Sequence, residues 1–262
     1  MSGTVVRDLV FKRVGERSLM LDLYLPSGSS QLLPLVVWVC GGGWTTMGKQ
    51  HGEGMAAWLT GYGLAVASIE YRVSSEAIFP AQIQDCKAAV RWLRAHADAY
   101  GLDVEHVGAM GDSAGGHLVE LLGTTAGLSA FEQDGVCPEQ SSAVQAVCAF
   151  YGPSDLADLP NAEQAVTNLL GAPAAEQPKL AAWGSPLHYV GPQTAPHLFV
   201  HGDADTLVPV RHSLRLAKAL RGHGVEAGLH IIPGAGHGGG EFRASDEVKR
   251  LVADFFLSHL KP

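Results

Sequence analysis

The stretch Gly111-Asp112-Ser113-Ala114-Gly115 decides the fold of this chain of 262 residues. The pattern Gly-x-Ser-x-Gly places a serine on a sharp turn between a strand and a helix, where larger side chains would clash with the neighbouring backbone. An apolar run at residues 106–110 comes directly before the turn, and a run of small and aliphatic residues that includes Leu118 and Leu121 follows it. The local sequence therefore predicts a strand, a strained turn and a helix, in that order.

Apolar runs alternate with helical patterns on both sides of this turn. The expected strands cover residues 35–39, 65–69, 106–110, 144–151, 198–201 and 229–232, and the expected helices cover residues 53–62, 80–99, 210–223 and 245–260. Short, almost wholly apolar strands separated by helices are typical of a mainly parallel sheet with helices on both faces. The chain is therefore expected to have an α/β fold.

Two segments depart from this alternation. Residues 5–25 show period-two patterning around Gly15 and Glu16, which predicts two antiparallel strands at the edge of the sheet. Residues 153–196 are rich in Ala, Pro and Gln and contain no clear strand. Long irregular segments in compact domains tend to be functional, so we interpret this one as an insertion or lid over a site, the alternative being a long excursion. We expect one domain over residues 1–262.

The charge balance disfavours a nucleic-acid partner. The chain has 26 acidic and 18 basic residues and a net charge of −8, whereas binding to phosphates needs clustered Lys and Arg. No apolar stretch approaches the roughly 18 residues that a membrane span requires. The first residues carry charges at Arg7, Asp8, Lys12 and Arg13, unlike the apolar core of a signal peptide. These features predict a cytoplasmic protein with no membrane or nucleic-acid partner.

The cysteines predict no metal site. Cys40, Cys86, Cys137 and Cys148 are widely spaced and form no CxxC pair. This usage indicates reduced thiols, although a bridge between Cys137 and Cys148 stays open as an alternative. No His, Cys and Asp cluster has the spacing of a zinc site, so neither a metal nor another cofactor is expected.

The serine of the turn has two candidate partners further along the chain. A serine hydroxyl is a weak nucleophile until a base takes its proton, and a third group must hold that base in the correct tautomer. Asp205 follows the expected strand 198–201, and His237 follows the expected strand 229–232 in a glycine-rich turn. The order Ser, Asp, His and the positions after strands predict Ser113 as nucleophile, His237 as base and Asp205 as the orienting acid. Asp203 and Asp155 are the rivals of Asp205.

A second glycine-rich turn, Cys40-Gly41-Gly42-Gly43-Trp44, follows the expected strand 35–39. Backbone without side chains brings N–H donors close to a developing oxyanion, and the N–H of Ala114 supplies a further donor. The glycines after His237 lack the lysine and serine of a phosphate-binding loop. We therefore interpret the turn at residues 40–44 as part of an oxyanion hole.

As a set, these motifs resemble those of the α/β-hydrolase esterases near the hormone-sensitive-lipase group, and within it the small esterases similar to bifunctional feruloyl and acetyl-xylan esterases. The resemblance extends from about Val5 onward and rests on segments 40–44, 70–72, 79–85, 111–118, 151–156, 201–205, 208–209 and 234–237. It implies Ser113, Asp205 and His237 as the catalytic triad and Gly42, Gly43 and Ala114 as the oxyanion hole. Cys40 departs from the family, which usually has histidine there, and we expect this change to affect the rigidity of the loop.

The resemblance implies a serine carboxylesterase that cleaves short-chain or aryl esters, acetyl and feruloyl esters among them, through an acyl-enzyme intermediate. The partner would be a small ester, such as one derived from a plant polysaccharide. Aromatic side chains in loops that the resemblance brings near the site are candidates for substrate contact, with core packing as the alternative: Trp44, Tyr71, Phe79 and Trp183. A peptidase resembling the prolyl-oligopeptidase catalytic domain, an arylformamidase and a non-catalytic binding protein are the other hypotheses. The sequence leaves the oligomeric state open.

Overall fold

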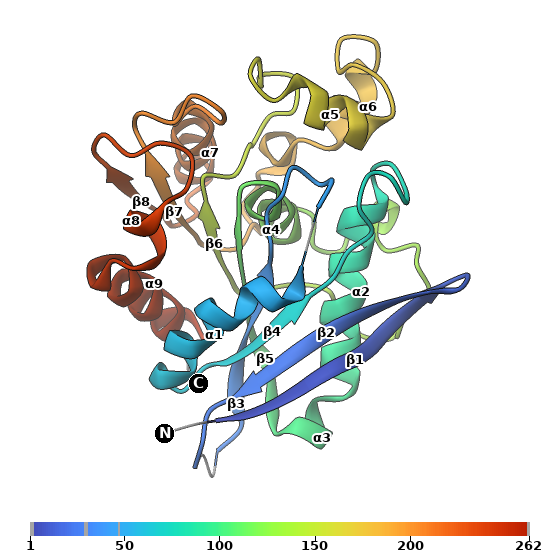
Figure 1. The fold of residues 1–262 in the computed structure, drawn as a ribbon, viewed down its shortest axis with the longest axis vertical. Coiled ribbons are helices and arrows are strands. Elements are labelled where there is room, and N and C mark those ends of the chain that lie inside the picture. Colours follow the sequence, from blue (N-terminus) through green and yellow to red (C-terminus); the bar gives the residue numbers. More distant parts are fainter. Residues whose placement is uncertain (1–2, 29–30, 47, 261–262) are drawn as a thin grey trace.

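The computed structural model describes residues 3–28, 31–46 and 48–260. Within these residues, eight strands form one sheet in the order β1-β2-β4-β3-β5-β6-β7-β8 (Figure 1). The strands are β1 (Thr4–Val14), β2 (Arg17–Leu25), β3 (Leu33–Val39), β4 (Ala65–Ile69), β5 (Leu102–Asp112), β6 (Ala146–Phe150), β7 (His197–Gly202) and β8 (Ala227–Ile232). β1 and β2 pair antiparallel, as do β2 and β4, and every pair from β4 to β8 is parallel.

Helices cover both faces of the sheet. They are α1 (Glu53–Leu59), α2 (Ala81–Ala95), α3 (Ala97–Tyr100), α4 (Ala114–Thr124), α5 (Glu163–Leu170), α6 (Pro178–Trp183), α7 (Arg211–Gly222), α8 (Gly240–Arg243) and α9 (Asp246–His259). Along β3, Val37 and Val39 pack in the same apolar cluster as α2, α4 and α7, whereas Val36 and Trp38 pack with α1 and α9. Successive side chains of a strand point to opposite faces, so each apolar run supplies two cores.

The fold class predicted from the sequence is confirmed, including the antiparallel N-terminal edge. Two expected helices differ. The segment 53–62 is α-helical as far as Leu59 and continues as a 3₁₀ turn over Thr60–Tyr62. The segment 80–99 divides into α2 and α3, because His96 leaves the helical conformation with φ of −111° and ψ of 10°. Pro80 caps the start of α2. β5 is longer than expected and reaches back to Leu102.

The irregular segment 153–196 contains α5 and α6 and, among its described residues, no strand. In Figure 1 these two helices stand above α4, on the side of the sheet where the parallel strands end. This position is also where loops of an open parallel sheet gather to form a site.

Two further expectations can be compared with the structure. All four cysteines are free thiols, so the alternative of a bridge between Cys137 and Cys148 is not realised. Within the described residues, no helix has both the length and the apolar character needed to cross a bilayer.

A buried ion cluster joins three parts of the chain beside β1. Asp85 of α2 is fully buried, and its Oδ1 accepts a hydrogen bond from Lys12 Nζ at 2.7 Å. Its Oδ2 accepts hydrogen bonds from the backbone N–H and the Nε of Arg72, at 2.9 and 2.8 Å. Buried charges are tolerated only when they are paired, so each member depends on the others.

We predict that Asp85→Asn lowers the free energy of unfolding by about 3–5 kcal/mol, because Lys12 is left as an uncompensated buried charge. Urea denaturation measures the change. The matched control is Asp254→Asn on the exposed side of α9, which is expected to change the free energy by less than about 0.5 kcal/mol. Equal losses for the two variants would contradict the assigned role of the cluster.

Candidate active site

The turn at Ser113 is held in a strained conformation by contacts of its neighbours. Ser113 lies between β5 and α4 with φ of 53° and ψ of −119°, a conformation that costs a non-glycine residue on the order of 1–3 kcal/mol. A Cβ atom at Gly115 would lie 2.0 Å from the carbonyl oxygen of Val39, and one at Gly111 would lie 2.5 Å from that of Gly115. The two glycines therefore let α4 begin directly against β3, and the serine side chain projects from the turn.

The structure brings the three predicted residues together in one hydrogen-bonded chain. Ser113 Oγ lies 2.8 Å from His237 Nε2, and His237 Nδ1 lies 2.7 Å from Asp205 Oδ2. An ionised carboxylate only accepts hydrogen bonds, so Nδ1 carries the proton and Nε2 is free to accept the proton of the serine. This is the arrangement in which a histidine acts as a base towards a hydroxyl.

Asp205 is buried and kept ionised by its hydrogen bonds. Its Oδ1 accepts hydrogen bonds from the backbone N–H groups of Leu207 and Val208, both at 2.9 Å. Burial by itself would raise the pKa of the Asp205 carboxyl, but hydrogen bonds from His201, His237 and the Val208 N–H outweigh burial and hold the pKa below its usual range. The carboxylate therefore stays charged opposite His237.

His201, at the end of β7, is a second histidine on this carboxylate that sequence reasoning did not assign. Its Nε2 lies 2.8 Å from the carbonyl oxygen of Val208, which can only accept, so Nε2 carries a proton. The same nitrogen lies 3.3 Å from Asp205 Oδ2. Nδ1 then accepts a hydrogen bond from Ser213 Oγ at 2.7 Å. The spacing of four residues between His201 and Asp205 was the signal available in the sequence.

The two rival carboxylates are engaged elsewhere. Asp203 is exposed, and its Oδ1 accepts a hydrogen bond from the backbone N–H of Gly234 at 2.6 Å. Asp155 forms an ion pair with Arg215 at 3.1 Å. Neither lies against His237 in the structure.

The loop 41–43 lies directly on the serine turn. A Cβ atom at Gly41 would lie 2.5 Å from the carbonyl oxygen of Asp112, and Gly42 and Gly43 have positive φ angles of 133° and 60°. Within the described part of the chain, the backbone N–H groups of Gly43 and Ala114 find no hydrogen-bond acceptor. Two donors beside Ser113 are thus available to a ligand oxygen.

Trp44 continues this loop and is held by a buried histidine of α4. Its Nε1 donates to His117 Nδ1 at 3.3 Å, and His117 Nε2 donates to the carbonyl oxygen of Gly184 at 2.6 Å. Burial lowers the pKa of His117 to about 4, so the ring is neutral. The neutral ring links the loop, α4 and the segment 153–196.

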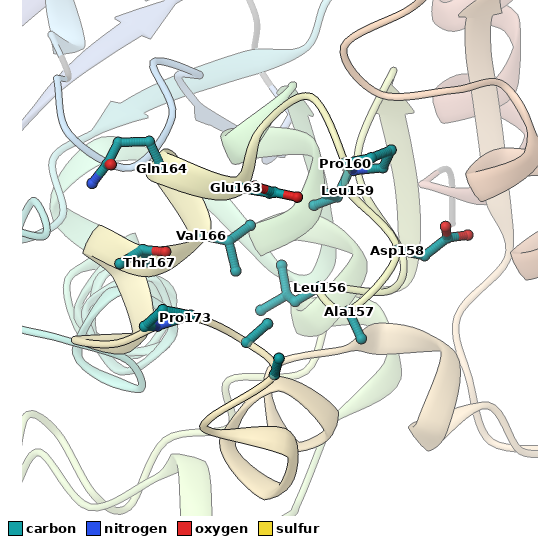
Figure 2. A pocket seen from close by; sticks show the side chains of 12 residues that line it. Leu156, Ala157, Asp158, Leu159, Pro160, Glu163, Gln164, Val166, Thr167 and Pro173 are labelled. Atoms are coloured by element: carbon teal, nitrogen blue, oxygen red, sulfur yellow. The ribbon is translucent and has the colours of Figure 1, made fainter.

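A cavity of about 290 Å³ opens at Ser113. Its lining is mostly apolar and comes from the loop 41–44, the serine turn, the segment 153–196 and the loop after Asp205: Gly43, Trp44, Ser113, Ala114, Pro153, Leu159, Asn161, Ala162, Gln164, Ala165, Leu207 and Val208. A larger neighbouring cavity has a volume of about 590 Å³. Leu156 and Val166 are turned towards its centre (Figure 2). The larger cavity shares Leu159 and Gln164 with the first, but none of the three triad candidates lines it.

Of the four aromatic candidates for substrate contact, the structure places Trp44 alone in the lining at Ser113. Phe79 and Trp183 instead pack edge-to-face at 5.4 Å, and both contact Phe131. Tyr71 is fully buried, and its hydroxyl donates to the carbonyl oxygen of Cys40 at 3.0 Å. In the structure these three rings pack against other parts of the fold and do not line this cavity, so their contact with a substrate stays a prediction.

Cys40 is buried at the base of the loop, and burial raises the pKa of its thiol to about 11. The thiol is therefore neutral near pH 7. The carbonyl group of Cys40, rather than its side chain, fixes the loop to Tyr71.

Comparisons with known proteins support the resemblance seen in the sequence. The BD-FAE family model matches residues 21–220. The chain is 32% identical to Esterase LipC of Mycobacterium tuberculosis over 214 residues, which are 78% of this chain and 53% of the relative. It is 30% identical to an acetylxylan esterase of Xylanibacter ruminicola over 241 residues, which are 89% of this chain and 46% of the relative. The chain thus spans about half the length of these curated relatives.

A solved structure is similar over its full length. A truncated form of a carbohydrate esterase from gut microbiota superposes with a TM-score of 0.89 and 31% identity, covering 98% of this chain and 96% of the other. The expected α/β-hydrolase fold and the expected likeness to esterases are therefore both confirmed.

We predict that Asp205→Asn lowers kcat for p-nitrophenyl acetate by about 10³- to 10⁴-fold, because the amide no longer holds His237 in the required tautomer. Asp203→Asn serves as the matched control and should retain activity to within about threefold, since only a backbone contact of its loop is altered. Steady-state rates test the ranking, and the reverse ranking would transfer the role to Asp203.

We also predict that stability is lost on acidification partly through His117. The ordinary pKa of 6.5 is lowered to about 4 in the folded state, so the unfolded chain takes up the proton first and stability falls from about pH 6.5 to pH 4. His117→Gln should remove about 2 kcal/mol of the loss between pH 7 and pH 5. Denaturation at both pH values measures this, with the exposed His223→Gln as a control. An unchanged pH dependence in His117→Gln would refute the assignment.

Proposed function

The chain belongs to the BD-FAE family, and from that premise we propose that it is a serine carboxylesterase acting on short-chain or aryl esters. The observation that carries the proposal is the hydrogen-bonded chain from Asp205 through His237 to Ser113, set beside two N–H groups without acceptors among the described residues. These are the parts that acyl transfer needs: a nucleophile, a base, an orienting acid and donors for an oxyanion.

The proposed mechanism has two half-reactions, and both use the same groups. Ser113 Oγ attacks the ester carbonyl carbon while His237 Nε2 takes the hydroxyl proton. The N–H groups of Gly43 and Ala114 stabilise the oxyanion, and the resemblance adds that of Gly42 as a third donor. His237 then protonates the leaving alcohol, and an acyl-enzyme remains on Ser113. A water molecule that gives its proton to His237 attacks this acyl group, and His237 passes the proton to Ser113 Oγ as the bond to the acyl group breaks and the acid leaves.

The cavity at Ser113 suits the acyl part of the substrate. The alcohol oxygen must face His237, which receives and returns the proton, whereas the cavity is lined by Ser113, Gly43 and Ala114 and not by His237. Its volume of about 290 Å³ lies just below the roughly 300–1,000 Å³ of sites for drug-sized ligands. The lining is apolar and includes Trp44, so a small alkyl acyl group or one aromatic ring is favoured over a long chain.

The names of two relatives support a substrate derived from carbohydrate. One is an acetylxylan esterase and the other a carbohydrate esterase. We therefore include acetyl and feruloyl esters of plant polysaccharide fragments in the proposal.

We predict that the wild-type chain hydrolyses p-nitrophenyl acetate and butyrate faster than the octanoate, because the cavity at Ser113 is small. Ser113→Ala should fold normally and lose activity by about 10⁴-fold or more, since the nucleophile is absent. Methyl ferulate and acetylated xylan, assayed in parallel, define the acyl and alcohol preferences. Folded wild-type protein that turns over no ester, or Ser113→Ala with full activity, would refute the proposal.

A further inference from the structure

Asp112, the residue before the proposed nucleophile, connects three separate parts of the site. Its Oδ1 accepts a hydrogen bond from the backbone N–H of Gly41 at 2.8 Å. Its Oδ2 accepts a hydrogen bond from Arg243 Nη2 at 2.5 Å and another from the hydroxyl of Tyr151 at 3.3 Å. The side chain of Asp112 is only 10% exposed.

Each contact of Asp112 leads to a different element of the proposed machinery. Gly41 begins the loop whose glycines carry the oxyanion donors. Arg243 ends α8, which follows the glycine-rich segment after His237. Tyr151 follows β6, and its ring packs edge-to-face on the His237 ring with centroids 4.7 Å apart. The carboxylate thus links the oxyanion loop to the chain segment that carries the base.

The start of the oxyanion loop is held by Asp112. The carbonyl oxygen of Gly42 accepts hydrogen bonds from the N–H groups of Thr45 and Thr46, whereas the N–H of Gly41 donates to Asp112 Oδ1. Residues 41–43 are glycines with no side chains, and a Cβ atom at Gly41 would lie 2.5 Å from the backbone of Asp112. The N–H of Gly41 is therefore fixed by a carboxylate whose own position depends on its partners. Among the described residues, Arg243 is the one cation paired with Asp112. A poorly solvated carboxylate without such a partner would turn towards water or draw in a proton.

We propose that Arg243 is a positioning residue for the oxyanion hole, acting through the Asp112 carboxylate on the N–H of Gly41. The inference rests on the proposed esterase function. It assigns Arg243 no contact with the substrate. Its effect falls on the donors that stabilise the oxyanion in the transition state, so loss of Arg243 lowers kcat and leaves KM nearly unchanged.

The first test compares Arg243→Gln with Arg250→Gln, an exposed arginine of α9 used as a matched control. We expect Arg243→Gln to lower kcat for p-nitrophenyl acetate by about 10- to 30-fold, less than the roughly 10²- to 10³-fold loss on removing a donor itself. The inhibition constant of a short alkyl trifluoromethyl ketone, whose adduct with Ser113 carries an oxyanion, should rise by the same factor. That of the matching methyl ketone should not change. Arg243→Lys should recover part of the loss.

The second test is a double-mutant cycle with Asp112→Asn, which keeps an oxygen for the N–H of Gly41 but removes the charge that pairs with Arg243. If Arg243 acts through Asp112, Arg243→Gln has less than about a twofold further effect in this background. An equal effect in both backgrounds would mean that Arg243 acts directly by its charge, and the proposal would be wrong.

The remaining outcomes separate this inference from the esterase proposal. If the wild type hydrolyses esters and Arg243→Gln is as active as Arg250→Gln, the inference fails and the proposed function stands. If thermal stability drops in Arg243→Gln while kcat and both inhibition constants hold, the role of Arg243 is purely structural and the inference again fails. If the wild type hydrolyses no ester, the proposed function itself fails.

Discussion

The first turn of α4 crosses the end of β3 so closely that no side chain fits between them. The Cβ position of Gly115 would fall 2.0 Å from a backbone oxygen of Val39, inside any permitted contact distance. This crossing forces Ser113 into its positive-φ conformation and brings the chain beyond β3 onto the turn. Ser113 and the N–H groups of Gly43 and Ala114 are thus adjacent because two backbones touch, and Asp205 and His237 are added to that contact from the loops after β7 and β8.

Much of this arrangement follows from local sequence, because wholly buried strands appear as unbroken apolar runs. The positions of Asp205 and His237 could also be predicted, since each comes just after such a run and parallel strands end at one edge of the sheet. The ion pair between Asp112 and Arg243 could not be predicted from the sequence. It joins residues 131 positions apart, and an arginine at the end of a four-residue helix carries no local mark of a partner. The sequence does not distinguish the two roles of a large ring in a loop, because such a ring packs into a core, as Phe79 does, as readily as it lines a site.

Three buried histidines around the site share one tautomer, and none of them is the proposed base. In His117, His201 and His212 the Nε2 atom faces a backbone carbonyl, so it carries the proton. The Nδ1 atom of each then accepts, from Trp44, Ser213 and the backbone of Ser154 respectively. An imidazole with both nitrogens hydrogen-bonded is a rigid spacer between two elements. His237 differs because its Nε2 faces the hydroxyl of Ser113 instead of a backbone carbonyl, while its Nδ1 donates to Asp205.

The wall of the cavity and the reacting groups come from different stretches of chain. Residues 153–196 supply Pro153, Leu159 and Asn161 to the lining but none of the triad candidates. The same segment is tied to the loop 41–44 through His117 by a backbone oxygen, that of Gly184. Side chains of this segment can therefore differ, and so change the shape of the cavity at Ser113, while the hydrogen bond from His117 to the main chain of the segment is kept.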